Sequence, residues 1–580
     1  MSSFYDLASL VMIPSGKKAG KVYSQKPLTT DGQLDFTRAS TATRIGSDGL
    51  IEKTRTNLLL QSNSFNTTWT TSNVTLTSGQ SGYNGTSNAW KLLSNSSSSE
   101  SYVRQTTTLT GVGSVSVYAK AGNVNFLGIY IGSTGVDVYS FFNLSTGLVG
   151  TKSNTIDAKI ESVGSGWYRC SVTGNNLDQN INLYVTDADG NFLSSNDNFI
   201  YIQDSQLEPG LVATNVITTT TAAVSVGSVD NMPRLNYTPG SATSCPSLLL
   251  EPQRTNLLAQ SEYFESSSYS KNNTSVTSNN AISPDGTLNA SKFVENTSNS
   301  SHSIYKNVVN GSGDFTISIF VKSAERSRVL ISNATTTRKA TFNLSNATIS
   351  DETGVSASMV SFGNDWYRCI ISYNTTSVAD EYFSINIIDN LNNLVYQGDG
   401  SSGVYIYGAQ LEVGSYATSY IPTFGATVTR VLDVGNNLGS GSIFNDSEGV
   451  LYVDVDFLTL SGNDYFGLNN GTNNERILIQ RSTNNISIFI NNSGNLNTSL
   501  TSTINKIAVS YKANDYKLYL NGNKVDTDTS SSVTPSGLNI FGFQLGGGFG
   551  LYFYGNAKQV LYFPTVLTDT QLAELTSIDS

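Results

Sequence analysis

The sequence is poor in the residues from which metal sites and disulfide scaffolds are built. Its 580 residues include one histidine, His302, and three cysteines, Cys170, Cys245 and Cys369. A closed zinc site usually takes four His or Cys ligands, and a disulfide framework takes a dense, even set of cysteines. We therefore expect no zinc site and no disulfide framework, so that packing alone holds the fold.

Charge is scarce as well. Charged residues make up 13% of the chain, and 33 Lys and Arg against 44 Asp and Glu leave a net charge of −11. This is not the composition of a highly charged, disordered chain. No Lys/Arg cluster could follow a phosphate backbone, so we expect no nucleic-acid partner. No apolar stretch approaches the roughly 20 residues that cross a bilayer, so we expect no membrane insertion.

Residues that favour strands are abundant. The chain has 50 Gly, 30 Tyr and 25 Phe beside only 4 Met. Segments 114–118, 314–322 and 383–388 alternate apolar and polar positions between clusters of Gly, Asn, Asp and Ser, which is typical of half-buried strands. We predict an all-β protein, and the length predicts about four modules in series.

The sequence also repeats itself at an offset of about 200 residues. Arg55-Thr-Asn-Leu-Leu59 returns as Arg254-Thr-Asn-Leu-Leu258, and Trp167-Tyr-Arg-Cys170 returns as Trp366-Tyr-Arg-Cys369. The offset drifts only from 199 at Arg55 to 204 at Gln206, as expected when loops change length and paired strands do not. We predict two duplicated jelly-roll β-sandwiches, copy 1 at 54–217 and copy 2 at 254–423.

The last module, 440–580, does not match the repeat. Alternation from Leu451 to Phe457 predicts a strand with one buried face, and Asn521-Gly522 predicts a hairpin turn. Thr568 followed by Gln571 predicts the capping box of one short surface helix. We therefore predict a third β-sandwich that carries a single helix.

The segments between these modules lack sustained periodicity. They are 1–53, an N-terminal arm, 218–253, a linker arm, and 424–439, a short linker. Such segments usually run along neighbouring domains or subunits instead of folding alone.

Several strings in this order resemble those of tailed-bacteriophage virion appendages, the head and tail fibres. They are Phe36-Thr-Arg-Ala-Ser-Thr-Ala-Thr-Arg44, Asn231-Met-Pro-Arg-Leu-Asn-Tyr237, Cys245-Pro-Ser-Leu-Leu-Leu-Glu-Pro-Gln-Arg-Thr-Asn256 and Gln410-Leu-Glu-Val-Gly-Ser-Tyr-Ala-Thr-Ser-Tyr-Ile-Pro-Thr423. In that group, tandem modules similar to carbohydrate-binding jelly rolls precede a concanavalin-like or laminin-G-like sandwich. The segment 507–525 is similar to the concanavalin-like pattern.

The resemblance implies a location, partners and an assembly. The protein would be made in the bacterial cytoplasm and exposed on the virion. The N-terminal arm would attach it to other virion proteins, and the C-terminal sandwich would point away from the particle toward glycans of the host or its surroundings. A homotrimer is the expected assembly, with a dimer as the alternative. No long heptad repeat supplies a coiled-coil stalk.

Four aromatic residues are the candidates for sugar binding. A sugar ring packs its C–H face on an exposed aromatic ring. Trp69 and Trp90 lie in Ser- and Asn-rich surroundings, and position 90 differs between the copies, where Ser291 replaces it. Tyr552 and Tyr554 are the candidates in the last module. One further tryptophan position recurs in both copies, as Trp167 and Trp366, and these two residues are expected to be packing residues.

One loop has the spacing of a calcium site. Asp187, Asp189 and Asn191 present oxygens at every second position, as Ca²⁺ loops do. A distal Glu is missing, and an Asp-Gly hairpin turn is the alternative. We expect no cofactor, with Ca²⁺ at this loop as the one candidate.

Catalysis is not expected. Glycoside hydrolysis needs two carboxylates in one groove, whereas Glu208 and Glu412 recur without a second acid and are assigned to structural hydrogen bonds. The single His302 could serve a Ser/His/Asp triad only once, and no nucleophile elbow surrounds it. The expected function is a non-enzymatic virion fibre that adheres to glycans. The alternatives are a purely structural connector and a polysaccharide depolymerase.

Overall fold

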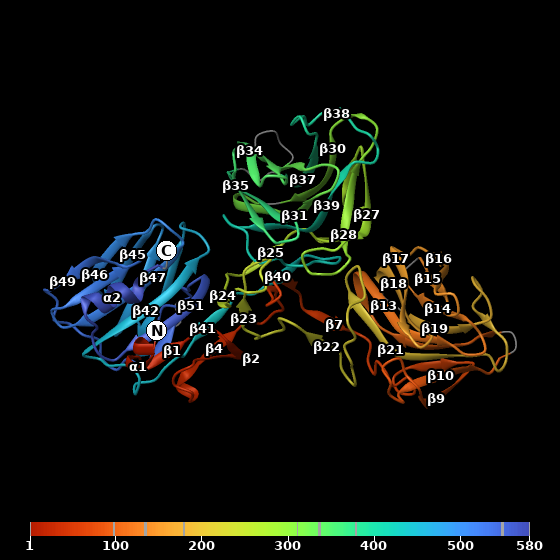
Figure 1. Cartoon of the computed structure of the whole chain (residues 1–580), viewed down its shortest axis with the longest axis horizontal. Coiled ribbons are helices and arrows are strands. Elements are labelled where there is room, and N and C mark those ends of the chain that lie inside the picture. The colour runs from red at the N-terminus through yellow and green to blue at the C-terminus, as the bar shows by residue number, and fades with distance from the viewer. Residues whose placement is uncertain are drawn as a thin grey trace.

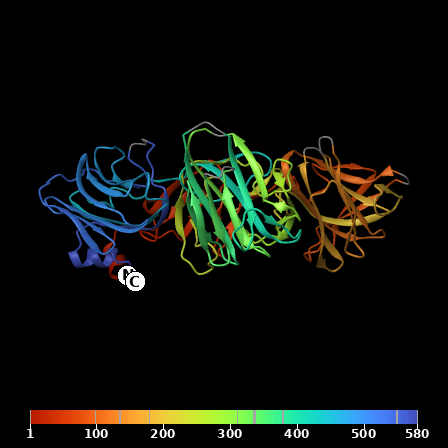
Figure 2. The ribbon, with the colours of Figure 1, turned by 90° about the horizontal axis from the view of Figure 1, so that it is seen from above.

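The computed structural model describes residues 2–96, 99–132, 136–177, 180–309, 311–333, 338–376, 380–546 and 550–578. Over these residues the chain is almost entirely β, with two α-helices, α1 (Ser2–Leu7) and α2 (Asp569–Thr576), and a 3-10 turn, η1 (Thr30–Gly32). Three β-sandwiches lie along the long axis, with copy 2 in the middle (Figures 1 and 2). The all-β prediction is confirmed. No helix in the described ranges is long and apolar enough to cross a membrane.

Copy 1 is a sandwich of two six-stranded antiparallel sheets. The first sheet has the order β17 (Asp157–Gly164), β18 (Trp167–Leu177), β13 (Leu109–Ala121), β21 (Phe199–Pro209), β10 (Ala89–Ser94) and β9 (Val74–Gln80). The second has the order β16 (Leu148–Ser153), β15 (Val138–Asn143), β14 (Phe126–Ile131), β19 (Asn180–Thr186), β12 (Tyr102–Thr106) and β8 (Thr70–Ser72).

Copy 2 repeats this arrangement strand for strand. Its first sheet has the order β35 (Ser356–Ser361), β36 (Trp366–Thr375), β31 (Gly313–Ser323), β39 (Gly403–Val413), β28 (Ala290–Glu295) and β27 (Thr274–Ala281). Its second has the order β34 (Thr348–Thr353), β33 (Lys339–Asn343), β32 (Arg328–Ser332), β37 (Asp380–Ile388), β30 (His302–Val309) and β26 (Ser270–Asn272).

The shared topology confirms the duplication. Small two-stranded ladders also recur, β11 (Ser99–Glu100) with β20 (Leu193–Ser194) and β29 (Asn299–Ser300) with β38 (Tyr396–Gln397). Each copy buries its own cluster of apolar side chains between its sheets, residues 59–207 in copy 1 and 258–411 in copy 2. The copies therefore pack two separate cores.

The C-terminal sandwich recruits strands from outside 440–580. Its first sheet runs β23 (Arg234–Asn236), β24 (Ser247–Leu250), β51 (Gly555–Phe563), β42 (Glu448–Phe457), β47 (Ile504–Lys512), β48 (Tyr516–Leu520) and β49 (Asn523–Asp528), and β1 (Leu10–Met12) also pairs with β51. Its second runs β46 (Ser493–Ser499), β45 (Asn485–Ile490), β44 (Arg476–Ser482), β43 (Asn463–Asn469) and β50 (Ile540–Gly542).

The local expectations for this module are confirmed. Leu451 and Phe457 face the core, Asn521 and Gly522 form the turn with φ of 51° and 86°, and Thr568 and Gln571 form the capping box. The alternation places Tyr452 on the exposed face of this strand, but Tyr452 is buried, because the outer face of β42 is covered. Tyr452 packs in a second apolar cluster with Phe4 and Leu572 and is only 2% exposed.

The N-terminal arm does not lead away from the C-terminal sandwich. Val11 pairs with Leu561 of β51, and the ring of Phe4 contacts that of Phe563. The marks of the two chain ends lie side by side at the C-terminal sandwich (Figure 2). The expectation that the arm and the C-terminal sandwich point in opposite directions is therefore wrong, because the arm supplies a strand to that sandwich.

The arms form hairpins that dock on other domains. One hairpin is β5 (Arg44–Ile45) with β6 (Ile51–Glu52), and the Ile51 amide donates to the Pro284 carbonyl of copy 2 at 2.9 Å. Its sequence counterpart is the hairpin β23–β24, which extends the C-terminal sheet. The ion pair Arg44–Glu52 corresponds to the pair Arg234–Glu251. The repeat therefore includes these hairpins.

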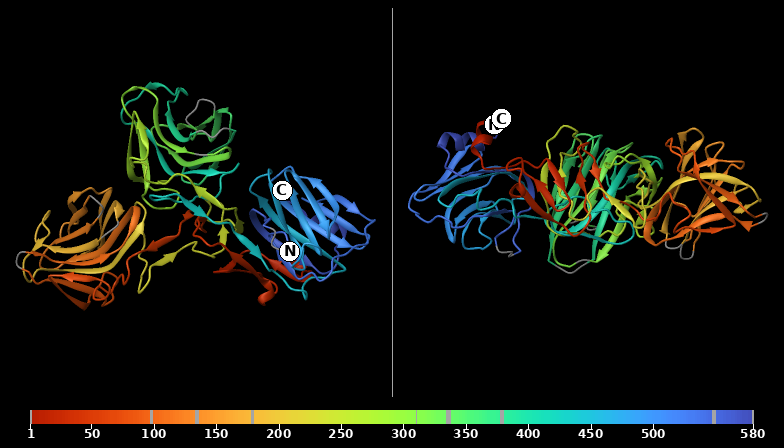
Figure 3. Two further views of the ribbon diagram at one scale, coloured as in Figure 1. Left: turned by 180° about the vertical axis from the view of Figure 1, so that it is seen from behind. Right: turned by 90° about the horizontal axis from the view of Figure 1, so that it is seen from below.

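Other strands of the arms and linkers pair with the first strand of each copy or with one another. They are β7 (Arg55–Asn57) with β22 (Val224–Val226), β25 (Arg254–Asn256) with β40 (Val428–Arg430), and the sheet β2 (Gly16–Lys18), β3 (Lys21–Tyr23), β4 (Gln33–Thr37) and β41 (Val434–Asn436). Seen from behind, the arms cross between the three sandwiches (Figure 3).

A buried ion network fastens this crossing. We call it the arginine hub, and it consists of Arg38, Arg234, Glu251, Arg430 and Asp433. Asp433 accepts from Arg38 at 3.1 Å and pairs with Arg234, while Glu251 pairs with Arg234 at 2.5 Å and with Arg430 at 2.8 Å. None of the five side chains is more than 3% exposed. Removing one partner of such a network leaves an uncompensated buried charge.

Candidate functional site

A cluster of aromatic rings covers the outer face of the second sheet of copy 1. We call it the tyrosine face, and it consists of Tyr102, Tyr130, Tyr139, Phe141, Tyr184 and Phe192. Neighbouring rings have centroids 4.6 to 6.5 Å apart, from Tyr184–Phe192 to Tyr130–Tyr184. These spacings fall in the range of favourable aromatic pairs.

The strand register brings these rings together. Tyr102 on β12 lies opposite Tyr184 on β19, and Tyr130 on β14 lies opposite Tyr139 on β15. The neighbouring positions Val103, Leu183 and Ile129 point into the core. Period-two alternation therefore turns the five strand residues of this set outward, all but Phe192.

Gly128 allows the sixth ring to lie across the sheet. It sits opposite both Tyr184 and Phe141, and a Cβ atom at this position would approach their side chains and the ring of Phe192 to 3.3–3.4 Å. Phe192 comes from the loop that follows β19. Phe141 and Tyr184 are buried beneath the cluster, whereas Tyr102, Tyr130, Tyr139 and Phe192 are half-buried and accessible.

Polar groups surround the rings. The Tyr184 hydroxyl donates to Glu100 at 3.2 Å and accepts from the Asn182 amide at 2.9 Å, and Tyr130 donates to Asp137 at 2.5 Å. Burial and the bond to Asp137 raise the pKa of Tyr130 to about 12. Asn182 is only 5% exposed, and its Oδ1 atom has no hydrogen-bond partner among the described residues.

A cation completes the surface. The Arg104 guanidinium lies 5.2 Å from the centre of the Tyr102 ring. The face thus combines ring surfaces with hydrogen-bond acceptors and donors, among them two carboxylates and a guanidinium. This is the chemistry that a sugar needs, because its C–H groups pack on rings while its hydroxyls take hydrogen bonds.

Among the residues of copy 2 that the structure describes, the equivalent face has no such cluster. Its strand pairings are the same, so the counterparts follow from the register. Tyr102, Tyr184, Tyr130, Tyr139 and Phe141 correspond to Ser303, Asn386, Ser332, Lys339 and Thr341. The glycine at 128 becomes Leu330. The duplicated fold does not require the aromatic residues, so they need another explanation.

Trp69 and Trp90 do not present exposed rings. They are 6% and 8% exposed, and both contact the ring of Phe65 in the core of copy 1. Their indole N–H groups donate to the backbone carbonyls of Gln61 and Asn63 at 3.2 and 3.0 Å. The expectation that they are exposed is wrong, because the Ser and Asn residues around them lie outside while the indoles point inward.

Tyr552 and Tyr554 lie in the segment between β50 and β51 of the C-terminal sandwich. They flank the core residue Phe553, are half-buried, and have ring centres 6.2 Å apart. Burial and the neighbouring Tyr416 and Tyr552 raise the pKa of Tyr554 to about 12. Sugar binding at this pair stays a prediction.

Asp187, Asp189 and Asn191 do not converge on a cation position. Asp187 accepts from Ser195 and Asn198, Asp189 accepts from Thr151 of β16, and Asn191 accepts from the Leu193 amide. Among the described residues no group of three His, Cys, Asp or Glu side chains could hold a metal ion. Each side chain is used to shape the loop, as in the hairpin alternative, and Ca²⁺ at this loop stays a prediction.

The residues assigned to packing and structure are found in those roles. Trp167 and Trp366 are 1% and 2% exposed. Glu208 accepts from the Thr214 amide at 2.8 Å, and Glu412 accepts from the Thr418 amide at 2.9 Å. Three free cysteines remain, of which Cys170 and Cys369 are buried and Cys245 is exposed. Burial raises the pKa of the Cys170 and Cys369 thiols.

No protein-family model matches the sequence, and no curated protein matches it either. Among solved structures, the CBM40 domain of a Ruminococcus gnavus sialidase bound to α2,3-sialyllactose aligns at 15% identity over 24% of this chain and 88% of its own, with a TM-score of 0.22. A tandem of CBM22 domains from Paenibacillus barcinonensis aligns at 9% identity over 65% and 100%, with a TM-score of 0.20. A Trypanosoma rangeli sialidase mutant aligns at 10% identity over 94% and 99%, with a TM-score of 0.21. Similarities this low assign neither a family nor a function to this chain.

A comparison of the two copies could have found the tyrosine face in the sequence. Each of its strand tyrosines stands at an outward position whose counterpart in the other copy is Ser, Asn or Lys. Position 90 also differs between the copies, but it faces inward. The useful signal is a difference between copies at outward positions only.

Proposed function

We propose that the protein is a non-enzymatic glycan-binding protein, and that the tyrosine face of copy 1 is the site that binds the glycan. The observation that carries the proposal is the set of outward rings that the duplicate sheet of copy 2 lacks. A fold used twice shows which residues the fold needs. The residues that only one copy has, on a surface of accessible rings, are the candidates for a function.

The chemistry of the face favours a chain of sugars. Glu100 and Asp137 place two carboxylates beside the rings, and such groups accept hydrogen bonds from hydroxyls. The accessible rings of Tyr102, Tyr130 and Tyr139 lie on three different strands. A platform of this width suits more than one sugar unit.

The wider setting that we propose is a virion appendage. Support comes from the strings that resemble tailed-phage fibre proteins, in particular 36–44, 231–237 and 410–423. In that setting the protein would be a head or tail fibre, assembled as a homotrimer or a dimer and bound to other virion proteins. Labelling the protein on intact particles for electron microscopy tests this location.

The binding proposal is tested with the full chain on a glycan array. The variant Tyr102→Ser with Tyr130→Ser removes two accessible rings and leaves the buried Phe141 and Tyr184 in place. The matched control is Tyr305→Ser, which removes an exposed tyrosine from the same sheet of copy 2. We expect the double variant to lose binding at least about tenfold and the control to bind as the wild type does.

The array also separates the alternatives. A wild-type chain that binds no glycan would favour the structural connector, and equal binding by the double variant would place the site elsewhere, with Tyr552 and Tyr554 next to test. Release of reducing ends from a bound polysaccharide would favour the depolymerase.

A further inference from the structure

A cavity of about 560 Å³ lies where the N-terminal arm, copy 1 and copy 2 meet. We call it the junction cavity. Its wall combines the arm segment 46–56, the end of copy 1 at 208–215, loops of copy 2 and the apolar residues Pro422 and Phe424. Its volume is that of a small-molecule site. The tyrosine face is on another sheet and contributes nothing to it.

The carboxylates in this wall already have partners. Lys53 reaches Glu262 at 2.9 Å and Asp285 at 2.6 Å, and these acids are 1% and 2% exposed. Glu52 pairs with Arg44, and Glu208 accepts from Thr214. Lys53 and its neighbouring hydrogen bonds hold the pKa of Asp285 below its usual range, against the effect of burial. The carboxylates of the cavity therefore need no further cation to be paired.

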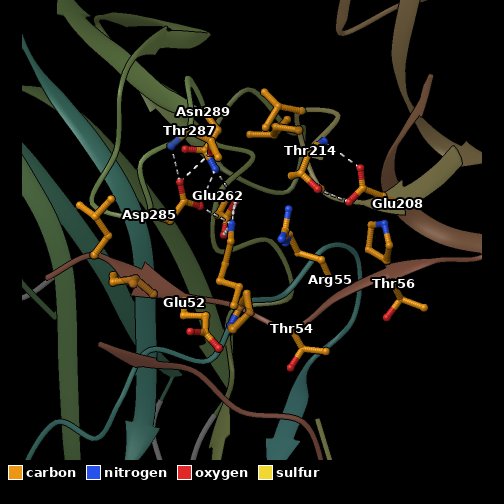
Figure 4. A pocket seen from close by; sticks show the side chains of 18 of the residues that line it. Glu52, Thr54, Arg55, Thr56, Glu208, Thr214, Glu262, Asp285, Thr287 and Asn289 are labelled. Atoms are coloured by element: carbon orange, nitrogen blue, oxygen red, sulfur yellow. Dashed lines mark hydrogen bonds and ion pairs between the residues drawn. The ribbon is translucent and has the colours of Figure 1, made fainter. Parts of the chain in front are cut away.

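Arg55 is the charged group in this wall that has no partner. Its guanidinium forms no hydrogen bond or ion pair with the described residues. Figure 4 shows Arg55 between the Glu262 cluster and the Glu208–Thr214 pair. Its counterpart in copy 2, Arg254, is held by the Tyr416 ring at 5.3 Å and by Glu412 at 3.8 Å. Val212 replaces that ring in copy 1, so Arg55 is left available.

A second group in the wall needs a hydrogen-bond donor. Asn289 is 2% exposed, and its amide nitrogen donates to Glu262 at 3.2 Å and to Asp285 at 3.1 Å. These two bonds fix the orientation of the amide. Its Oδ1 atom is buried and has no partner among the described residues. Buried acceptors are normally satisfied.

We propose that the junction cavity binds a small hydroxylated monocarboxylate, of the class of acidic monosaccharides. Arg55 would take the carboxylate, because a guanidinium matches that group with two parallel hydrogen bonds. A hydroxyl would donate to Asn289, and Phe424 offers an apolar wall to the ring. The many carboxylates nearby disfavour a ligand of higher negative charge. This inference goes beyond the glycan-binding proposal and does not depend on it.

Isothermal titration of the full chain with glucuronate tests the inference, with glucose, acetate and glucose phosphate as comparison ligands. Glucose lacks the anion, acetate lacks the hydroxyls, and the phosphate carries a larger charge. We expect glucuronate to bind at least about tenfold more tightly than each of them. Equal or tighter binding of any comparison ligand would overturn the assignment of the ligand class.

Two variants locate the site. Arg55→Gln and, separately, Asn289→Leu should each weaken glucuronate binding at least about tenfold, and melting curves check that both remain folded. Asn289→Leu also removes the hydrogen bonds from Asn289 to Glu262 and Asp285. Arg55→Gln is therefore the decisive variant, because it removes no described contact. The control Arg104→Gln and the Tyr102/Tyr130 double variant should bind glucuronate as the wild type does. No binding by the wild type, unchanged binding by Arg55→Gln, or loss in the controls would overturn the inference.

Discussion

Copies 1 and 2 have the same strands in the same order, yet their surfaces are used differently. In copy 2 the first sheet is covered by the arm hairpin β5–β6, with Ile45 and Ile51 packed in one cluster with Phe320, Phe362 and Trp366. In copy 1 the corresponding sheet is covered by its own loop, where Tyr83 stacks on Tyr118 at 3.8 Å. Copy 2 is thus fastened to the arms, whereas copy 1 closes its own surface.

The difference teaches how a duplicated domain divides its tasks. Copy 2 has the ion pairs with Lys53 and lies beside the arginine hub, so its surface is committed to assembly. Copy 1 keeps its aromatic outer face accessible. The Asn279 amide of copy 2 donates to Asp157 of copy 1 at 2.7 Å, and the Val112 amide of copy 1 donates to the Phe424 carbonyl of the linker at 2.6 Å. We expect copy 1 to unfold as a separate unit and copy 2 to unfold together with the C-terminal sandwich.

The largest effect is expected at the arginine hub. Asp433→Ala leaves Arg38 and Arg234 buried without their shared carboxylate, which should cost about 3–5 kcal/mol. In scanning calorimetry the transition of copy 2 and the C-terminal sandwich should fall by about 10 °C, and the transition of copy 1 should not move. Asp365→Asn is the control, because that side chain is 82% exposed and Asn tolerates the backbone φ of 63° at this position. A uniform shift of all transitions would show that the copies are not independent.

The hairpin contact should come next. Ile51→Ala creates a cavity beneath the arm and should lower the free energy of unfolding by about 2–4 kcal/mol, again in the copy 2 transition. In copy 2, Ile51 belongs to the same apolar cluster as Phe362. The counterpart of Phe362 in copy 1 is Val163, and Val163 is 41% exposed because no hairpin covers it. Val163→Ala should change stability by less than about 0.5 kcal/mol. Equal effects at the two positions in chemical denaturation would contradict the comparison.

The hub should also make copy 2 sensitive to acid. Burial alone would raise the pKa of Glu251, but Arg430 and Arg234 outweigh it and hold that pKa well below its ordinary value. A carboxyl group of this kind stabilises the folded state above an unfolded pKa of about 4.3, and the stabilisation is lost as the pH falls below it. The melting temperature of the copy 2 transition should therefore decrease as the pH is lowered from 6 to 3.

The corresponding pair in the first hairpin provides the control. Glu251→Gln should remove much of this acid sensitivity and also lower stability at neutral pH, whereas Glu52→Gln, at a position with a side chain 34% exposed, should leave the acid sensitivity unchanged. Acid sensitivity that survives in Glu251→Gln would assign it to another group.

The smallest effect is expected from a swap between the copies. Tyr269 stands where copy 1 has Trp69, and its hydroxyl donates to Gln260 as the Trp69 indole donates to Gln61. Trp69→Tyr should therefore cost less than about 1.5 kcal/mol and leave glycan binding intact. Lost binding without lost stability would restore Trp69 as a sugar contact.

Much of the fold could be predicted from the sequence, because repeats and alternation are local signals. The duplicated sandwiches, the Asn521-Gly522 turn and the Thr568 cap all follow from short strings. The recruitment of β1, β23 and β24 into the C-terminal sheet could not, because strand pairing between residues about 300 to 550 positions apart leaves no local pattern.

The site was harder to predict for a related reason. Composition around Trp69 and Trp90 describes their neighbours, whereas the direction of a side chain depends on the strand register. The tyrosine face joins four strands and a loop that are adjacent only after folding. Arg55 was visible as part of a repeated motif, but its missing partner is a property of the folded surroundings.

Hydrogen–deuterium exchange of the full chain, with and without a glycan identified on the array, tests the division of tasks most directly. The account predicts that the glycan slows exchange in copy 1 at 102–106, 126–131, 138–143 and 180–194. It predicts no change in the corresponding strands of copy 2, at 302–308, 328–332, 339–343 and 381–388. Protection in the strands of copy 2, or equal protection in both copies, would contradict it.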